Sequence, residues 1–204
     1  MPSASKRVFF DNCIFEVCEN VYEPAEDSFM FAEHLQVNDE ARVLDMGTGT
    51  GILGIVAAKK AREVLSVDLN PYAIRCSKRN AQINGTIDKM YFVQGDLFMP
   101  LGETAKFDLI LFNAPYLPSE PSESQSWIEH AWAGGPTGRK VIDRFITEAL
   151  VHLEQSGEIM LMQSNLAGVE ETKARFASAG LGANVVTQLA LPFFETLVLL
   201  KATF

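Results

Sequence analysis

The 204-residue sequence is poor in cysteine, and this shortage limits the chemistry it can carry. Its three cysteines, Cys13, Cys18 and Cys76, include no CxxC pair. A structural zinc site needs about four ligands at suitable spacing, and nothing in the sequence supplies them. We therefore expect three free thiols in a reducing compartment and no metal site.

Positive charge and long apolar runs are also scarce. The 17 Lys and Arg residues are outnumbered by 26 Asp and Glu residues, which gives a net charge of -9. Proteins that bind nucleic acids usually have a basic face, so a long nucleic acid is a disfavoured partner. No apolar run reaches the roughly 18 residues that span a bilayer, and residues 1–11 lack the apolar stretch of a secretory signal. We expect a cytoplasmic protein with no membrane partner.

The rest of the chain alternates between buried strands and amphipathic helices, which is typical of an α/β fold with a mainly parallel sheet. Residues 8–18 resemble a short hairpin turned at Asp11-Asn12. Only "ALPFFE" separates the last two strands, which predicts an antiparallel last strand. We expect a seven-stranded sheet with helices on both faces, in one domain over 1–204. Within it, 1–24 would form the hairpin and a loop, and 116–138 a long loop on the substrate side. The expected strands are 41–46, 63–68, 89–94, 107–113, 157–163, 183–189 and 196–202.

A glycine-rich turn follows the first expected strand of the sheet in "VLDMGTGTG". Its glycines, Gly47, Gly49 and Gly51, allow a tight turn and the close approach of a ligand. Residues 49–54 also match GxGxxG, and Asp68 ends the next strand where an acidic residue would bind ribose hydroxyls. A protein that binds NAD is therefore one interpretation of this segment.

The acidic residues around this turn favour a different cofactor. Asp45 directly precedes the glycines, where its charge would oppose a pyrophosphate but suit an ammonium group. S-adenosylmethionine has an ammonium group, a sulfonium and no phosphate. In this interpretation Asp68 binds the ribose, Asp96 accepts from the adenine amino group, and the Leu97 backbone N–H donates to the ring. The three carboxylates end successive strands, at the edge where open α/β sheets bind ligands.

The segment "LILFNAPYLPSE" ends another apolar strand in a polar amide, Asn113. A planar NH2 group is a poor nucleophile, because its lone pair is delocalised. The Asn113 side-chain oxygen and the Ala114 carbonyl could accept its two N–H bonds and orient the nitrogen toward a methyl group. Pro115 would fix the turn, and Tyr116 would offer a ring face to a flat acceptor. Catalysis would then depend on positioning and on acceptor dipoles.

These residues resemble the NPPY motif of amino-group methyltransferases, which act on glutamine amides, on adenine N6 or on guanine N2. Two further segments, "VYEPAEDSF" (21–29) and "EHAWAGGPTGRKVIDRF" (129–145), resemble the HemK-related glutamine methyltransferases of archaea and eukaryotes. The resemblance covers about residues 8–201. It implies a class I methyltransferase of Rossmann-like fold that uses S-adenosylmethionine to methylate the GGQ glutamine of class I translation termination factors.

The resemblance also implies roles for single residues and for a partner. It assigns cofactor contacts to Ser28, Asp45, Gly47, Asp68, Asp96, Leu97 and Asn113. Asn113 would be shared with the acceptor, beside Pro115 and Tyr116. Family members often need a small zinc-binding activator protein that pairs along a sheet edge, for which residues 89–94 with Tyr91 and Phe92 are the expected edge. A DNA or RNA amino-methyltransferase and a non-catalytic cofactor-binding scaffold remain the alternatives.

The sequence departs from the family pattern at Ala114, where the family usually has proline. The carbonyl acceptor is kept, but alanine adds a backbone N–H that must find a partner. Arg139 directly follows the long loop 116–138. We expect Arg139 either to orient substrate carbonyls or to be surface charge.

Overall fold

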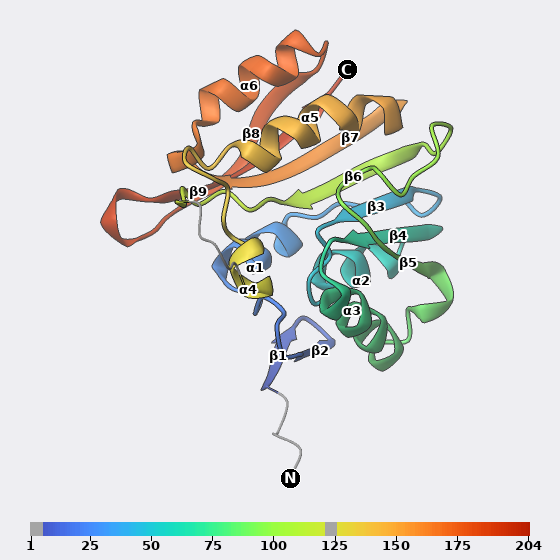
Figure 1. The fold of residues 1–204 in the computed structure, drawn as a ribbon. Coiled ribbons are helices and arrows are strands. Elements are labelled where there is room, and N and C mark those ends of the chain that lie inside the picture. Colours follow the sequence, from blue (N-terminus) through green and yellow to red (C-terminus); the bar gives the residue numbers. More distant parts are fainter. Residues whose placement is uncertain (1–5, 121–125) are drawn as a thin grey trace. The chain divides into compact units, whose positions relative to one another are not determined.

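The computed structural model describes residues 6–120 and 126–204. The chain divides into two compact units, Met1–Pro100 and Leu101–Phe204. Each unit contains β-strands flanked by helices, as Figure 1 shows. The expectation of one domain over the whole chain stays a prediction.

Three parallel strands form the sheet of the first unit, in the order β5-β4-β3. The strands are β3 (Arg42–Met46), β4 (Glu63–Asp68) and β5 (Met90–Gln94). Helices α1 (Glu26–Glu33), α2 (Ile52–Ala58) and α3 (Pro71–Ile83) and a short 3-10 helix, η1 (Ile87–Lys89), complete this unit. Local signals fix α3: the Asn70 side chain accepts from the Tyr72 N–H, Pro71 opens the helix, and Gly85 follows it at φ +70°.

An N-terminal hairpin, β1 (Lys6–Phe10) and β2 (Cys13–Val17), turns at Asp11-Asn12 as predicted. Asn80 of α3 fastens it to the first unit. The Asn80 side-chain oxygen accepts from the Glu16 N–H, and its amide donates to the Glu16 carbonyl, both at 2.9 Å. Cys13, Cys18 and Cys76 are free thiols, as expected.

Four strands form the sheet of the second unit, in the order β6-β7-β9-β8. Strand β9 is antiparallel to both of its neighbours, whereas β6 and β7 are parallel. The strands are β6 (Phe107–Asn113), β7 (Leu153–Ser164), β8 (Gly182–Ala190) and β9 (Thr196–Thr203). The helices are α4 (Trp127–His130), α5 (Lys140–His152), α6 (Val169–Ser178), η2 (Asn165–Ala167) and η3 (Pro192–Phe194).

The core of the second unit is aromatic and aliphatic. Phe145 of α5 and Phe176 of α6 are fully buried, and the Phe145 ring lies 4.5 Å from that of Phe112 in β6. In Figure 1, α5 and α6 lie on the same side of the strands of this unit. The seven strands β3 to β9, of which β9 is antiparallel to its neighbours, confirm the predicted fold class.

Two local expectations differ from the structure. Strand β7 begins at Leu153, not at residue 157, because Leu153 pairs with Phe107 of β6 and the polar residues after it stay in the strand. The loop 116–138 contains α4, a helix too short to give a periodic pattern; Ser126 and Glu129 close it with a capping box. Residues 121–125 of this loop lie outside the described residues. None of the described helices is long and apolar enough to cross a membrane.

Candidate active site

The cofactor residues predicted in the first unit lie at the carboxyl ends of its three parallel strands. Asp45 is near the end of β3, Asp68 ends β4, and Asp96 lies two residues beyond β5. The register pairs Asp45 with Ser66 and Asp68 with Gln94, so the three strands end at the same edge. The structure thus brings the three predicted carboxylates to one edge of this unit, where open α/β sheets bind ligands.

Asp45 is buried and holds the glycine-rich turn. Its carboxylate accepts from the Thr48 hydroxyl at 2.5 Å and from the Gly54 N–H at 3.1 Å. Burial raises the pKa of Asp45 to about 7; the two hydrogen bonds oppose this rise and the charge of Asp68 adds to it. A cation beside the turn would favour the ionised form.

Gly54, in the first turn of α2, is a residue to which our sequence interpretation gave no role. A Cβ atom at Gly54 would lie 2.6 Å from the Asp45 carboxylate and 3.1 Å from the Ser66 hydroxyl. Only glycine therefore lets α2 approach the strands closely enough to bind Asp45. The last glycine of the GxGxxG match was the available signal.

Asp68 links the turns after β3 and β4. One carboxylate oxygen accepts from the Gly49 N–H at 2.9 Å, and the other accepts from the Asn70 N–H at 2.8 Å. A carboxylate has about four acceptor positions, so two backbone donors leave capacity for ribose hydroxyls. Burial raises the pKa of Asp68, and the two backbone hydrogen bonds oppose that rise.

The turn after β5 contains Asp96 and Leu97. The preceding Gly95 donates its N–H to the Asp68 carbonyl at 3.0 Å, which ties this turn to the end of β4. Leu97 is buried and has φ +47°, an uncommon conformation for a leucine. The Met99 N–H donates to the Asp96 carbonyl and closes the turn. An uncommon backbone conformation next to predicted adenine contacts is typical of a binding turn.

Ser28, the residue inferred from the family segment, lies in the first turn of α1 and is buried. Its hydroxyl and its N–H both donate to the Asp27 carboxylate, at 3.1 and 2.6 Å. The Tyr22 hydroxyl is also within hydrogen-bond distance of Asp27, and burial raises the pKa of Tyr22. Glu23 of the same segment instead forms an exposed ion pair with Lys6.

The predicted acceptor turn, Asn113 to Tyr116, lies in the second unit at the end of β6. Asn113 is opposite Met162 of β7, and the Ala114 N–H donates to the Met162 carbonyl at 3.3 Å. The N–H that alanine adds relative to the family's proline therefore extends the β6–β7 pairing by one residue. Pro115 and Tyr116 follow, both partly buried.

Residues 132–138 of the long loop contact the backbone of this turn at Tyr116 and Leu117. The Leu117 N–H donates to the Trp132 carbonyl at 2.9 Å, and the Gly134 N–H donates to the Leu117 carbonyl at 2.8 Å. Gly138 has φ +72°, and a Cβ atom there would lie 2.2 Å from the Tyr116 carbonyl oxygen. Gly138 thus fits the backbone of the acceptor turn directly, a role that our sequence interpretation missed.

Arg139 does not lie on the surface, so the expectation of a plain surface charge was wrong, and a role in orienting substrate carbonyls stays a prediction. It is buried, and its guanidinium donates to the Gly168 carbonyl at 2.9 Å and to the Thr172 hydroxyl at 3.0 Å. It also forms ion pairs with Asp143 and Glu171. Arg139 therefore joins the start of α5 to the start of α6, next to the loop that supports the acceptor turn.

Comparison with solved structures identifies the class of fold. The chain resembles one chain of the E. cuniculi Mtq2–Trm112 complex, with a TM-score of 0.70, 25% identity and coverage of 90% of this chain and 98% of that one. The Methanocaldococcus jannaschii tRNA m1G37 methyltransferase, at 17% identity and a TM-score of 0.70, shares the fold; the match covers 100% of this chain and 58% of that chain. The fold is that of the class I methyltransferases.

Comparison of sequences narrows the class to a family. Residues 23–181 match the family described as Methyltransferase small domain. A Methanocaldococcus jannaschii protein, provisionally named a protein N5-glutamine methyltransferase, is 40% identical over 181 residues, which are 88% of this chain and 90% of that protein. The human methyltransferase HEMK2 is 34% identical over 198 residues, 90% of each chain. The chain belongs to the HemK-related methyltransferases, as the sequence motifs predicted.

Proposed function

We propose that this enzyme uses S-adenosylmethionine to methylate the N5 amide of the GGQ glutamine in a class I translation termination factor, in the cytoplasm. The observation that carries the proposal is the Asn-Ala-Pro-Tyr turn, which places an amide side chain and a peptide carbonyl at the end of β6. The names of the relatives agree with it. The E. cuniculi complex is described as responsible for methylation of the termination factor eRF1.

The acidic edge of the first unit fits this cofactor. S-adenosylmethionine presents an ammonium group, ribose hydroxyls and an adenine amino group, all of which donate hydrogen bonds to carboxylates. Asp45, Asp68 and Asp96 supply three such carboxylates on consecutive turns. A pyrophosphate would bring negative charge to a buried carboxylate, so the same edge disfavours a dinucleotide. When bound, the cofactor supplies an electrophilic methyl group on its sulfonium.

The second unit supplies the acceptor chemistry. A glutamine amide has two N–H donors, and the Asn113 oxygen and the Ala114 carbonyl are two acceptors that can bind them. Binding both donors orients the nitrogen lone pair and stabilises the positive charge that develops on nitrogen during transfer. No strong base is needed, because the proton leaves a nitrogen that has become acidic. Pro115 and Gly138 restrict the turn, so the acceptors are held in place beforehand.

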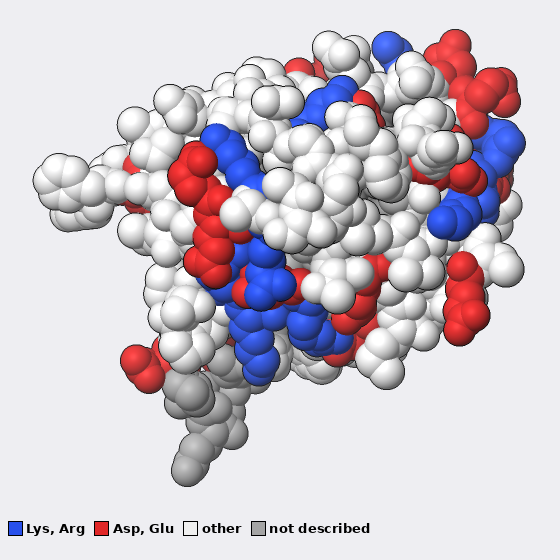
Figure 2. Space-filling view, turned by 90° about the horizontal axis from the view of Figure 1, so that it is seen from above, with Lys and Arg blue, Asp and Glu red and all other residues white. Residues whose placement is uncertain are grey.

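The surface charge also favours a protein acceptor. On the face shown in Figure 2, a group of adjoining basic side chains lies in the lower centre, and acidic side chains lie directly beside it. With the net charge of -9, this mixed arrangement is unlike the extended basic face that tracks a phosphate backbone. A nucleic-acid acceptor is therefore disfavoured.

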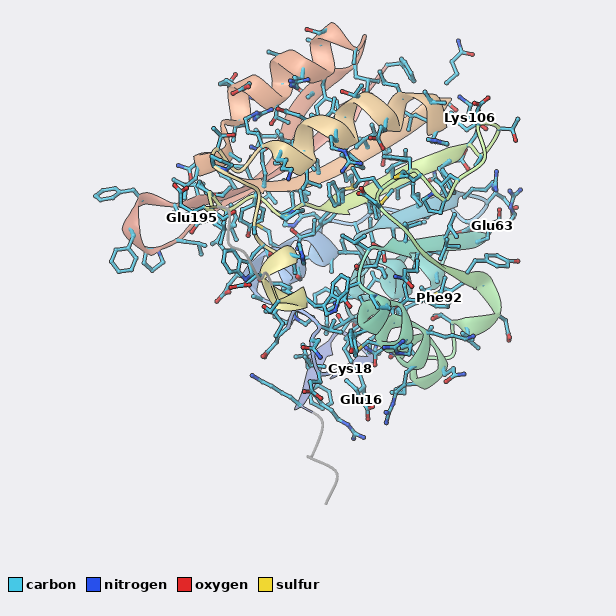
Figure 3. The ribbon with its side chains drawn as sticks, in the orientation of Figure 1. Glu16, Cys18, Glu63, Phe92, Lys106 and Glu195 are labelled. Carbon is cyan, nitrogen blue, oxygen red and sulfur yellow. The ribbon has the colours of Figure 1, made fainter. Side chains whose placement is uncertain are left out.

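We also propose that a small zinc-binding activator pairs with β5. This strand ends the order β5-β4-β3, and an edge strand offers unpaired backbone groups to another chain. Tyr91 is 57% exposed on it, whereas Phe92, labelled in Figure 3, is half-buried. The complex of Mtq2 with Trm112 supports a partner of this kind.

The test is to incubate the enzyme with methyl-labelled cofactor and either a class I termination factor or oligonucleotides, with and without co-expressed activator. We expect label on the factor, located at the GGQ glutamine by peptide mapping, and none on a factor whose GGQ glutamine is replaced by alanine. Label on the oligonucleotides alone would refute the proposal. Cofactor binding without any transfer would indicate a scaffold instead.

A further inference from the structure

The loop between β8 and β9 exposes two adjacent phenylalanines almost completely. Phe193 is 96% exposed and Phe194 is 97% exposed, whereas Phe112, Phe145 and Phe176 of the same unit are buried. Burying such a side chain stabilises a fold, so two neighbouring exposed rings forgo a large stabilisation. Exposed pairs of this kind mark interaction sites more often than isolated apolar residues do.

Specific hydrogen bonds build this loop. The Leu191 N–H donates to the Glu195 carbonyl at 2.8 Å and closes it. The Asn165 side chain binds the loop twice: its amide donates to the Phe194 carbonyl at 3.2 Å, and its oxygen accepts from the Thr196 N–H at 2.8 Å. The two rings are therefore presented by a closed loop that η2 anchors. Figure 3 labels Glu195 at this loop, which projects beyond the strands of the second unit.

The backbone of both phenylalanines is strained. Phe193 has φ +63° and Phe194 has φ +65°, in the left-handed region that bulky residues rarely adopt. Such conformations destabilise the backbone and cluster at binding sites. The backbone strain and the exposed rings do not stabilise the second unit, which favours a role for the two phenylalanines in binding another molecule.

The strand register places this loop at the same edge as the acceptor turn. Leu197, at the start of β9, is opposite Ser164, the last residue of β7. Met162 of β7 is opposite Asn113 of β6. The loop before β9 therefore emerges where β6 and β7 end, two strand spacings from β6, or about 10 Å across the sheet.

We propose that the loop Pro192–Phe194 docks the protein that carries the acceptor glutamine, with Phe193 and Phe194 entering an apolar pocket on its surface. This inference rests on the proposed function. A folded protein that presents a side chain to Asn113 must cover the surrounding edge, and a standard interface of about 800 Å² per partner extends well beyond 10 Å. Exposed aromatic anchors are the residues that dominate such interfaces.

Other occupants fit this loop less well. Insertion into an anionic membrane surface requires basic residues beside the apolar ones. Here Glu195 follows the two rings, and the chain has a net charge of -9. A second copy of the chain would bury the rings in a dimer, and this is tested directly below.

The experiment compares the wild type with the double variant Phe193→Ala/Phe194→Ala. The control is Phe204→Ala, which removes a ring 61% exposed just past the other end of β9. With an intact termination factor as substrate, we expect the double variant to raise KM at least tenfold and to leave kcat within twofold. Phe204→Ala should change neither value. Cofactor affinity and melting temperature should match the wild type in both variants.

Four outcomes are informative. A KM within twofold of wild type, with the wild type active, would overturn docking and leave the proposed function standing. A tenfold weaker binding of the factor by the double variant, measured by calorimetry, would support docking even if the wild type transfers no methyl group, in which case the proposed function alone fails. A wild-type dimer that the double variant abolishes in sedimentation would assign the loop to self-association and refute the proposal. A tenfold effect of Phe204→Ala would show that the effect is not specific to the loop, and would also refute it.

Discussion

The glycine-rich turn after β3 and the acceptor turn after β6 are stabilised by different kinds of structure. In the first, Asp45 binds Gly54 of α2, the Gly47 N–H donates to the Val67 carbonyl of β4, and Asn80 of α3 donates to the Thr50 carbonyl. In the second, Leu117 binds Trp132 and Gly134, and the Tyr116 carbonyl packs on Gly138. The cofactor turn is thus held by regular strands and helices, whereas the acceptor turn depends on residues 132–138, which lie outside any helix or strand. Changes in that segment should affect catalysis without touching the cofactor residues.

The largest effect is expected from Asn113→Ala. This change removes one of the two hydrogen-bond acceptors from the acceptor turn and leaves the cofactor turn unchanged. Loss of one preorganised group of this kind costs on the order of 10²–10³ in kcat. Cofactor affinity should stay within about tenfold, or roughly 1.4 kcal/mol, because the first unit is unchanged. Single-turnover methylation and equilibrium binding of the cofactor measure the two quantities. Asn184→Ala, at an exposed position of β8, is the matched control. Normal methylation by Asn113→Ala would show that the Asn113 side chain is not needed to bind the N–H groups of the substrate amide.

Gly138→Ala tests the support of the acceptor turn. The added Cβ would lie 2.2 Å from the Tyr116 carbonyl oxygen, at φ +72°. We expect a loss of about 3 kcal/mol in the free energy of unfolding and at least a tenfold loss of turnover, because small displacements of reacting groups are costly. Urea denaturation and steady-state methylation measure these effects.

Gly180→Ala provides the control for Gly138→Ala. Gly180 has φ +85° but no heavy atom within 4 Å of the added Cβ, so this variant introduces backbone strain without a clash. It should lose about 1 kcal/mol of stability and keep full turnover. If both variants behave alike, Gly138 contributes only its backbone conformation and does not position Tyr116.

A third effect concerns the first turn and depends on pH. Because the pKa of Asp45 is raised to about 7, the folded protein binds this proton more tightly than the unfolded chain does. In cofactor-free protein, the free energy of unfolding should therefore fall as pH rises from about 4 to 7, by about 1.4 kcal/mol for each unit of difference in pKa as an upper bound. The raised pKa of Asp68 acts in the same direction.

Asp45→Asn separates these contributions. The amide that this variant introduces can still accept from the Gly54 N–H but does not titrate. The free energy of unfolding of the variant should therefore fall less between pH 5 and 7.5 than that of the wild type. Asp88→Asn, at an exposed position, should keep the wild-type slope. Urea denaturation at several pH values gives the slopes, and equal slopes for Asp45→Asn and wild type would contradict the assignment.

The contrast between the two turns also explains what the sequence could predict. Strand ends, the Asn70 cap and the position of Asp68 follow from local patterns, and the structure agrees with them. The role of Gly138 could not be predicted, because it depends on how two parts of an irregular loop pack on each other, which no periodic pattern or motif indicates. The burial of Arg139 was missed for a related reason: its partners Gly168 and Thr172 come from the start of α6, and a charge pattern does not reveal burial between helices.

The smallest effect is expected from Ala114→Pro, which restores the residue usual in the family. Proline removes the N–H that donates to Met162, a loss of about 0.5–1.5 kcal/mol. It also restricts the unfolded chain, which gains about 0.4–1 kcal/mol. The two terms nearly cancel, so the free energy of unfolding should change by less than about 1 kcal/mol. Turnover should stay within about threefold, because the carbonyl acceptor is kept.

Ala114→Gly keeps the donor but loosens the turn, so it should reduce stability more than proline does. A tenfold loss of turnover in Ala114→Pro, without loss of stability, would instead mean that the hydrogen bond to Met162 sets the position of the acceptor carbonyl.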